Sequence, residues 1–286
     1  MESRALDTED VAAIYDELIE VYEREWDRQD HRSLHLAYYD DEHTEPAAAS
    51  INTMRVLAEA AGVAEGDRVL NVGCGAGADS VYLARAHGAR VDGVNISESQ
   101  LELAREHARE AGVADLTTFR YDDFHELATV DEGSVDVYWG LEALSHADDL
   151  PAALAGARRV LAPDGRLALT DLFVRGDPTP AEREDLRTLE DGLGVRLGPV
   201  DDLRDGLADL GFRAVAVRDA TDAVEPATKR RYSFSRVAGY AGPLLRKIGF
   251  FSETQVAAIN ASKLLHELVT GGTLGYDVVT ADAPAE

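Results

Sequence analysis

The chain has very little cysteine and lysine, and it has no long apolar run. Cys74 is the single cysteine among 286 residues, which excludes an internal disulfide and a cysteine-rich metal site. Its apolar stretches fall short of the ~20 residues that a membrane-spanning helix needs. Histidines and carboxylates show no metal-ligand spacing, so no metal is expected.

Negative charge dominates the composition. The sequence holds 28 Lys and Arg against 54 Asp and Glu, a net charge of -26, and it has lysine only at positions 229, 247 and 263. Such a chain repels phosphate backbones and anionic membranes, which predicts a small-molecule substrate and no nucleic-acid or membrane partner. The acidity indicates either adaptation to high salt or an ordinary acidic protein.

The first residues of the sequence bear on the location of the protein in the cell. Met1 is followed by acidic residues instead of a basic and apolar leader, which predicts a cytoplasmic location. Whether the protein forms a homo-oligomer is left open.

From Arg68 onward the sequence alternates short apolar runs with helical patterns. This alternation is typical of βαβ units, and it predicts an α/β fold with a Rossmann-like, mostly parallel, seven-stranded sheet covered by helices on both faces. Residues 1–62 are expected to form an N-terminal helical lid, with helices at 8–28 and 46–61. Residues 63–225 and 272–286 are expected to form the core, and 226–271 a helical insertion before the last strand.

The stretch VLNVGCGAGADS, residues 69–80, predicts a strand that runs into a glycine-rich ligand-binding turn. Gly73, Gly75 and Ala78 satisfy the relaxed dinucleotide pattern, so a nicotinamide cofactor is one interpretation. Three features disfavour it. Gly77 makes the pattern G-x-G-x-G, Asp92 lies before the end of its strand at Asn95, and more than sixty residues precede the loop.

Two long stretches carry a family resemblance: VLNVGCGAGADSVYLARAHGARVDGVNIS and SVDVYWGLEALSHADDLPAALAGARRVLAPDGRLALTDLF. They resemble class I S-adenosylmethionine-dependent methyltransferases over about residues 66–173. SLHLAYYDDE and LVTGGTLGYDVV resemble the small-molecule branch, which includes sterol, tocopherol and sarcosine/dimethylglycine methyltransferases. The resemblance implies methyl transfer to an N, O or C atom of a small metabolite, with S-adenosylhomocysteine as product. A cofactor-binding regulator without catalysis is the non-enzyme alternative.

Carried over by position, the resemblance implies one set of cofactor-binding residues: Asn71, Gly73, Gly75, Gly77, Asn95, Ile96, Gln100, Asp122, Asp123, Phe124 and Leu141. The glycines would wrap the methionine moiety, and Asn95 and Gln100 would contact the ribose. Gln100 also fits a capping box with Ser97. Asp122 would accept from the adenine amino group, or it simply ends a strand. Asn71 stands where the family commonly has Asp or Glu, which predicts modestly weaker cofactor binding.

The methyl acceptor must be aligned and deprotonated, and the candidates follow the fourth and fifth strands. His146 is the candidate base, with Asp171 as orienter and Glu142 as the third catalytic candidate. If their segment is helical, Glu142 and His146 share a face. Some relatives have histidine where this chain has Ser145, so His146 is alternatively a substrate contact or a helix-capping residue. Glu142 and Asp171 could instead bind a cationic or hydroxylated substrate.

Aromatic residues supply the candidate substrate walls. They are Trp26, His35, Tyr38, Tyr39 and Trp139. Together with carboxylates, such a group suits an ammonium acceptor through cation–π attraction. Trp139 is equally well explained as a core residue of a central strand.

Overall fold

The computed structural model describes residues 32–247 and 252–285. In these residues a seven-stranded sheet has the order β3-β2-β1-β4-β5-β7-β6. Its strands are β1 (Arg68–Val72), β2 (Arg90–Asn95), β3 (Thr117–Tyr121), β4 (Val135–Leu141), β5 (Leu161–Val174), β6 (Arg213–Asp219) and β7 (Leu274–Asp282). The first five pair in parallel, and β7 runs antiparallel to both β5 and β6. The predicted Rossmann-like, mostly parallel sheet is confirmed.

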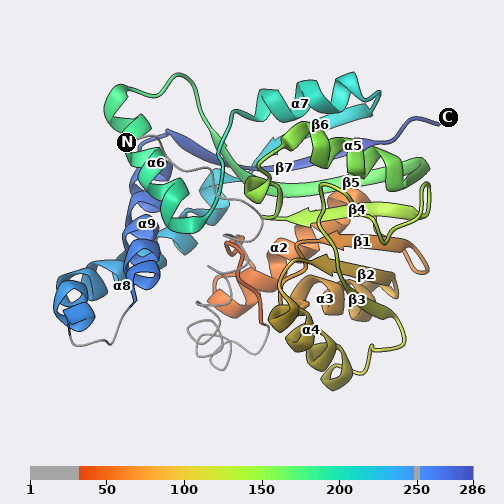
Figure 1. Ribbon diagram of the computed structural model, residues 1–286, viewed down its shortest axis with the longest axis horizontal. Coiled ribbons are helices and arrows are strands. Elements are labelled where there is room, and N and C mark those ends of the chain that lie inside the picture. The colour runs from red at the N-terminus through yellow and green to blue at the C-terminus, as the bar shows by residue number, and fades with distance from the viewer. Residues whose placement is uncertain (1–31, 248–251, 286) are drawn as a thin grey trace.

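Helices cover both faces of this sheet (Figure 1). Helices α2 (Pro46–Ala61), α3 (Ala78–His87) and α4 (Glu98–Glu110) lie on one face, and α5 (Leu150–Val160) and α7 (Val200–Asp209) on the other. Two buried clusters correspond to these layers: Met54, Val81 and Leu101 belong to one, and Leu154 and Leu207 to the other. Each helix therefore buries one apolar stripe against the sheet, as its sequence period predicts.

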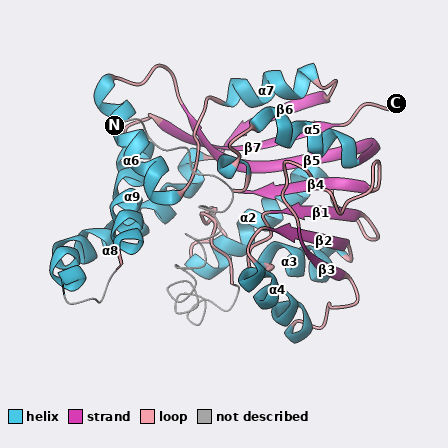
Figure 2. Cartoon of the chain, in the orientation of Figure 1, coloured by secondary structure: helices cyan, strands magenta, loops and turns pink. Residues whose placement is uncertain are grey.

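Three further helices gather beyond one end of the strands (Figure 2). They are α6 (Pro180–Leu193), α8 (Thr221–Lys247) and α9 (Glu253–Thr270), and we call them the helical cap. Gly192 of α6 lies so close to α9 that a Cβ there would be 2.8 Å from the Ala261 Cβ. The cap thus includes α6, from within 63–225, in addition to the predicted insertion.

Local sequence signals explain the ends of several elements. Helix α2 follows the predicted limits, with Pro46 in its first turn and Gly62 in the left-handed region after it. Helix α6 begins with a capping box between Thr179 and Glu182. The helix predicted over 8–28 lies outside the described residues. No helix in the described ranges is both long and apolar enough to span a membrane.

Candidate active site

The glycine turn after β1 forms an open cradle at the carboxyl end of the central strands. Gly73, Gly75 and Gly77 have φ values of 61°, 52° and 82°, a region that side chains disfavour. At Gly77 a Cβ would also lie 2.9 Å from the Ala104 Cβ, so glycine lets α3 begin directly against α4. Gly73 is exposed, and its backbone is therefore accessible to a ligand.

At the end of β2, two buried carboxamides face each other. Asn95 Nδ2 donates to Gln100 Oε1 at 2.7 Å, and Asn95 Oδ1 accepts from the Ile96 amide at 2.8 Å. Ser97 caps α4 by accepting from the Gln100 amide, but the Gln100 side chain bonds Asn95, so no capping box forms. Gln100 Nε2 is buried without a hydrogen-bond partner among the described residues. An unpaired buried donor beside a glycine cradle fits the ribose hydroxyls of the expected cofactor.

Asp122 and Asp123, the two acidic residues after β3, make different contacts. Asp122 accepts from the amides of Ala128 and Thr129 and from the Thr129 hydroxyl, so both of its carboxylate oxygens shape the following loop. This arrangement favours the interpretation that Asp122 ends the strand. Asp123 is more exposed and accepts at Oδ1 from the amide and Nδ1 of His125. The Phe124 ring stacks at a tilt on His125, with centroids 4.7 Å apart.

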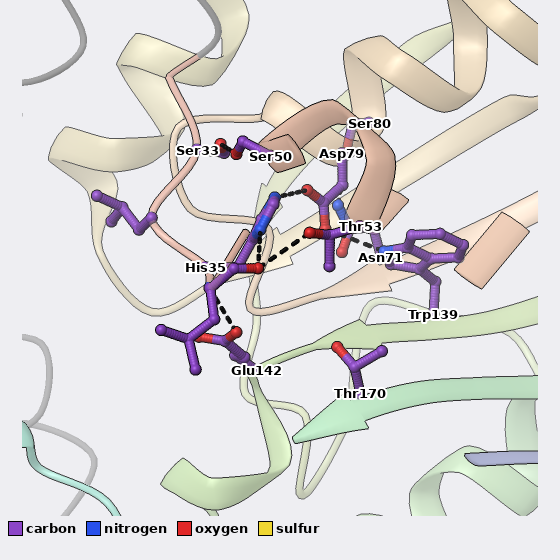
Figure 3. Close-up of polar contacts among 12 residues, drawn as sticks. Ser33, His35, Ser50, Thr53, Asn71, Asp79, Ser80, Trp139, Glu142 and Thr170 are labelled. Atoms are coloured by element: carbon purple, nitrogen blue, oxygen red, sulfur yellow. Dashed lines mark hydrogen bonds and ion pairs between the residues drawn. The ribbon is translucent and has the colours of Figure 1, made fainter. Parts of the chain in front are cut away.

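Asn71 turns its side chain into α3. Its Nδ2 donates to Ser80 Oγ at 3.0 Å, and both residues are buried (Figure 3). In the β1–β4 pairing Asn71 lies opposite Trp139, whose indole N–H donates to Asp79 Oδ2 at 3.0 Å. Trp139 is completely buried in the core and holds Asp79 in place. It lines no accessible wall in the structure, in agreement with the core alternative.

Glu142 directly follows β4 in the left-handed conformation, with φ 53°. Its Oε1 accepts from the Leu36 amide at 2.7 Å and lies 3.0 Å from the Tyr276 hydroxyl, which is 2.9 Å from Thr170 Oγ1. Burial raises the pKa of Glu142 to about 7, although Arg231 opposes the shift. Glu142 is not helical and only residues 144–146 form a short 3-10 turn, so the condition under which Glu142 and His146 would share a helical face is not met.

Asp171 and His146 are linked through that turn. Asp171 Oδ2 accepts from the Ser145 amide at 2.8 Å and Oδ1 from the Leu172 amide at 2.9 Å. Burial raises the pKa of Asp171 to about 6. His146 directly follows Ser145 in this turn, and its Nδ1 lies 2.8 Å from the Gly194 carbonyl oxygen. Burial lowers the pKa of His146.

Residues 33–39 cross the carboxyl ends of the strands, and we call this segment the strap. Arg231 of α8 donates to the Leu34 carbonyl at 2.6 Å, and Glu142 accepts from the Leu36 amide. Thr53 Oγ1 accepts from the Tyr38 amide, and the Tyr39 amide donates to the Ala223 carbonyl. Three separate parts of the fold, namely α2, the end of β4 and α8, thus hold one irregular segment over the site.

The strap places its aromatic residues in different surroundings. His35 is buried next to Asp79, with Nε2 4.0 Å from Asp79 Oδ1 (Figure 3). The Tyr38 ring instead lies under the Arg218 guanidinium, 5.9 Å from its carbon, and does not join His35. Trp26 lies outside the described residues. The described residues contain no cluster that could hold a metal ion.

Comparison with known proteins decides the family. A family model for the methyltransferase domain matches residues 70–169. The 27-O-demethylrifamycin SV methyltransferase of Amycolatopsis mediterranei is 34% identical over 213 residues, 74% of this chain and 76% of that protein. The chain belongs to the class I S-adenosylmethionine-dependent methyltransferases. This methyltransferase acts on small molecules, which sets aside the nicotinamide and regulator alternatives.

Two further relatives agree with this assignment. The O-methyltransferase rstn1 of Aspergillus nomiae is 33% identical over 193 residues, 66% of this chain and 84% of that protein. The geranyl diphosphate C-methyltransferase of Streptomyces coelicolor, solved with S-adenosylhomocysteine, superposes with a TM-score of 0.77 at 21% identity. That superposition covers 96% of this chain and 97% of the other. The methyltransferase therefore shares its fold with this solved structure over nearly the whole of both chains.

Three residues that the structure brings to the site are not among those predicted from the sequence. Tyr276 contacts Glu142 across 134 positions, Arg231 holds the strap across 197, and Asp79 faces His35. For Asp79, its place two residues after the last glycine of the turn was a usable signal. For Tyr276 and Arg231 the sequence carries no local signal, because each acts through a partner far along the chain.

Proposed function

We propose that this methyltransferase transfers the methyl group to a hydroxyl oxygen of a small natural product, with His146 as the general base. The observation that carries the proposal is the contact between His146 Nδ1 and the Gly194 carbonyl oxygen. A carbonyl only accepts, so the ring must donate from Nδ1, and its lone pair is then at Nε2. The lowered pKa of His146 keeps the imidazole neutral at pH 7 and able to take a proton.

Asp171 acts in this proposal as a positioning residue. Its Oδ2 holds the Ser145 amide, and the Ser145 carbonyl in turn accepts from the Arg196 amide at 2.5 Å. The turn that carries His146 and the segment that carries the Gly194 carbonyl are therefore fastened together. Glu142 holds the strap through the Leu36 amide, which supports a role in closing the site over the acceptor. Tyr39, whose amide binds the first turn of α8, belongs to the same closure.

When bound, the cofactor supplies an electrophilic methyl group on a sulfonium sulfur. We assign its methionine part to the turn of Gly73, Gly75 and Gly77. Gln100 Nε2 has no hydrogen-bond partner in the described part of the chain, which supports a ribose contact for the Asn95–Gln100 pair, beside Ile96. The greater exposure of Asp123 supports that residue, with Phe124, at the adenine. A backbone contact from Leu141, at the end of β4, completes this assignment.

The oxygen acceptor is supported by the relatives. One is named for 27-O-demethylrifamycin SV and another is an O-methyltransferase. A hydroxyl needs a base in the transition state, whereas a nucleophilic carbon of an alkene does not require one at the start of transfer. The histidine held by Gly194 fits the first requirement.

The proposal is tested with methyl-labelled cofactor and a panel of hydroxylated macrocyclic and aromatic polyketides, including 27-O-demethylrifamycin SV. Product mass and fragmentation report which atom gains the label. We expect label on oxygen, and we expect it to disappear when the reactive hydroxyl is already methylated. Transfer that persists on the blocked compounds, at nitrogen or carbon, would contradict the proposal.

Three further proposals concern the solvent, the location and the assembly of the protein, and the acidic composition supports the first of them. We propose that the acidic surface is adapted to high salt, that the protein works in the cytoplasm, and that identical chains associate. Melting the protein across a salt series tests the first, and greatest stability in dilute buffer would contradict it. Fractionation of the producing cells and light scattering of the purified chain test the other two.

A further inference from the structure

An unusual pair of hydrogen-bond acceptors lies between the strap and the glycine turn. His35 Nε2 and Asp79 Oδ1 face each other at 4.0 Å, with side chains 5% and 13% exposed (Figure 3). Within the described ranges, His35 Nε2 is buried without a hydrogen-bond partner. The opposite Asp79 oxygen, Oδ2, already accepts from the Trp139 indole.

Neither of these two side chains can donate a hydrogen bond to the other. His35 Nδ1 lies 3.1 Å from the Leu36 carbonyl oxygen, so the ring donates there and presents a lone pair at Nε2. Burial lowers the pKa of His35 to about 4, so the imidazole is neutral at pH 7. Asp79 has only acceptor atoms when ionised, and its pKa of about 6 leaves it ionised at that pH. One negative and one neutral acceptor therefore face each other without a proton between them.

A primary ammonium group matches this arrangement. A tetrahedral nitrogen about 2.9 Å from two acceptors holds them roughly 4 to 5 Å apart, which agrees with the observed separation. Its positive charge would also offset the cost of burying the Asp79 carboxylate. A neutral hydroxyl donates only one hydrogen and cannot serve both acceptors.

The neighbouring Asn71 indicates which ammonium is bound. Asn71 is neutral where the family commonly has an acid, and its amide is directed to Ser80 on α3. Asp79 lies in the first turn of the same helix, two residues after Gly77, next to the turn that receives the methionine part of the cofactor. We propose that Asp79 and His35 together bind the α-ammonium of S-adenosylmethionine, and that Asp79 supplies the charge that Asn71 lacks.

Calorimetric binding of two ligands tests this proposal without turnover. S-adenosylhomocysteine carries the ammonium, whereas 5′-methylthioadenosine lacks the amino-acid part. We expect Asp79→Asn to weaken S-adenosylhomocysteine by about tenfold and His35→Phe by about threefold, because each loses a bond to a charged group. Both variants should bind 5′-methylthioadenosine as the parent protein does. Asp92→Asn, an equal charge change on the half-buried partner of Arg120, is the matched control and should bind both ligands unchanged.

Asn71→Asp provides an independent arm. We expect no tightening of S-adenosylhomocysteine by this change alone, since two carboxylates would then compete, but recovery of affinity when it is added to Asp79→Asn. An unchanged affinity of Asp79→Asn for S-adenosylhomocysteine would overturn the proposal and leave an acceptor amine as the alternative occupant. Equal weakening of both ligands would overturn it too, because the loss would then come from the turn as a whole.

Discussion

The two sides of the site are built in different ways. The cofactor side, at the ends of β1, β2 and β3, uses residues close in sequence, such as Asn95 with Gln100 and Asp122 with Thr129. The acceptor side, at the ends of β4, β5 and β7, joins Glu142 to Leu36 and Tyr276 over more than a hundred positions. The cofactor side is thus formed by contacts between residues that are close in the sequence. The acceptor side depends on how the strap and helical cap pack.

The largest expected effect is that of His146→Ala, which should change the rate of methyl transfer but not the binding of the cofactor. We expect His146→Ala to lower the rate of methyl transfer by at least about 100-fold, the usual contribution of a general base, while cofactor affinity stays unchanged. Single-turnover transfer and calorimetric binding of S-adenosylhomocysteine measure the two quantities. A variant that keeps its transfer rate would exclude His146 as the base.

The next largest effect is expected from adding one methyl group to the glycine turn on the cofactor side. Gly77→Ala should lower the free energy of unfolding by about 3 kcal/mol, because the alanine would have an unfavourable left-handed backbone conformation and its Cβ would also clash with Ala104. Gly75→Ala is the matched control, since its Cβ meets nothing within 4 Å. It should cost only about 1 kcal/mol for its backbone conformation. Equal losses in urea unfolding would contradict the packing explanation.

The third prediction concerns pH and the acceptor side. The folded protein keeps the Glu142 proton up to about pH 7, whereas the unfolded chain loses it near its ordinary value of 4.5. The contribution of this group to stability is therefore fully present below pH 4.5 and is lost as the pH rises toward 7. Glu142→Gln removes this loss, so its melting temperature relative to the parent should rise between pH 5 and pH 8.

The groups that face Glu142 limit how that experiment is interpreted. Arg231, Asp171 and Tyr276 lie close enough to shift its pKa, and all three stay in the Glu142→Gln variant. The comparison with the parent protein therefore reports the titration of Glu142 together with its coupling to these three groups. A melting-temperature difference that is the same at both pH values would show that Glu142 is ionised throughout.

The smallest expected effect tests the contact between β7 and β4. Tyr276→Phe removes the hydroxyl between Glu142 and Thr170 and should destabilise the protein by about 1 kcal/mol. It should also raise the pKa of Glu142 further, because the carboxylate loses a donor. Tyr121→Phe, at a tyrosine that is 58% exposed, is the control and should change neither quantity. Equal melting temperatures for both variants would mean that the buried hydroxyl contributes nothing.

The difference between the two sides also explains what the sequence could predict. Strand alternation, the glycine turn and the limits of α2 follow from local periodicity and backbone preference, and they were predicted correctly. Gln100 showed two local options, and a structure was needed to see its side chain turn to Asn95. Trp139 could not be placed from sequence, because a strand residue faces core or site according to what packs on it. The strap contacts of Arg231 and Glu142 require the complete fold.

The central claim is that an imidazole held by the Gly194 carbonyl deprotonates the acceptor, and the pH dependence of single-turnover transfer tests it most directly. With saturating cofactor and a 27-O-demethylrifamycin-type acceptor, the rate should rise with pH along a limb whose midpoint lies below the ordinary histidine pKa, because burial lowers the pKa of His146. His146→Ala should be slow and should lack this limb. A parent profile without the limb, or a limb that persists in His146→Ala, would contradict the account.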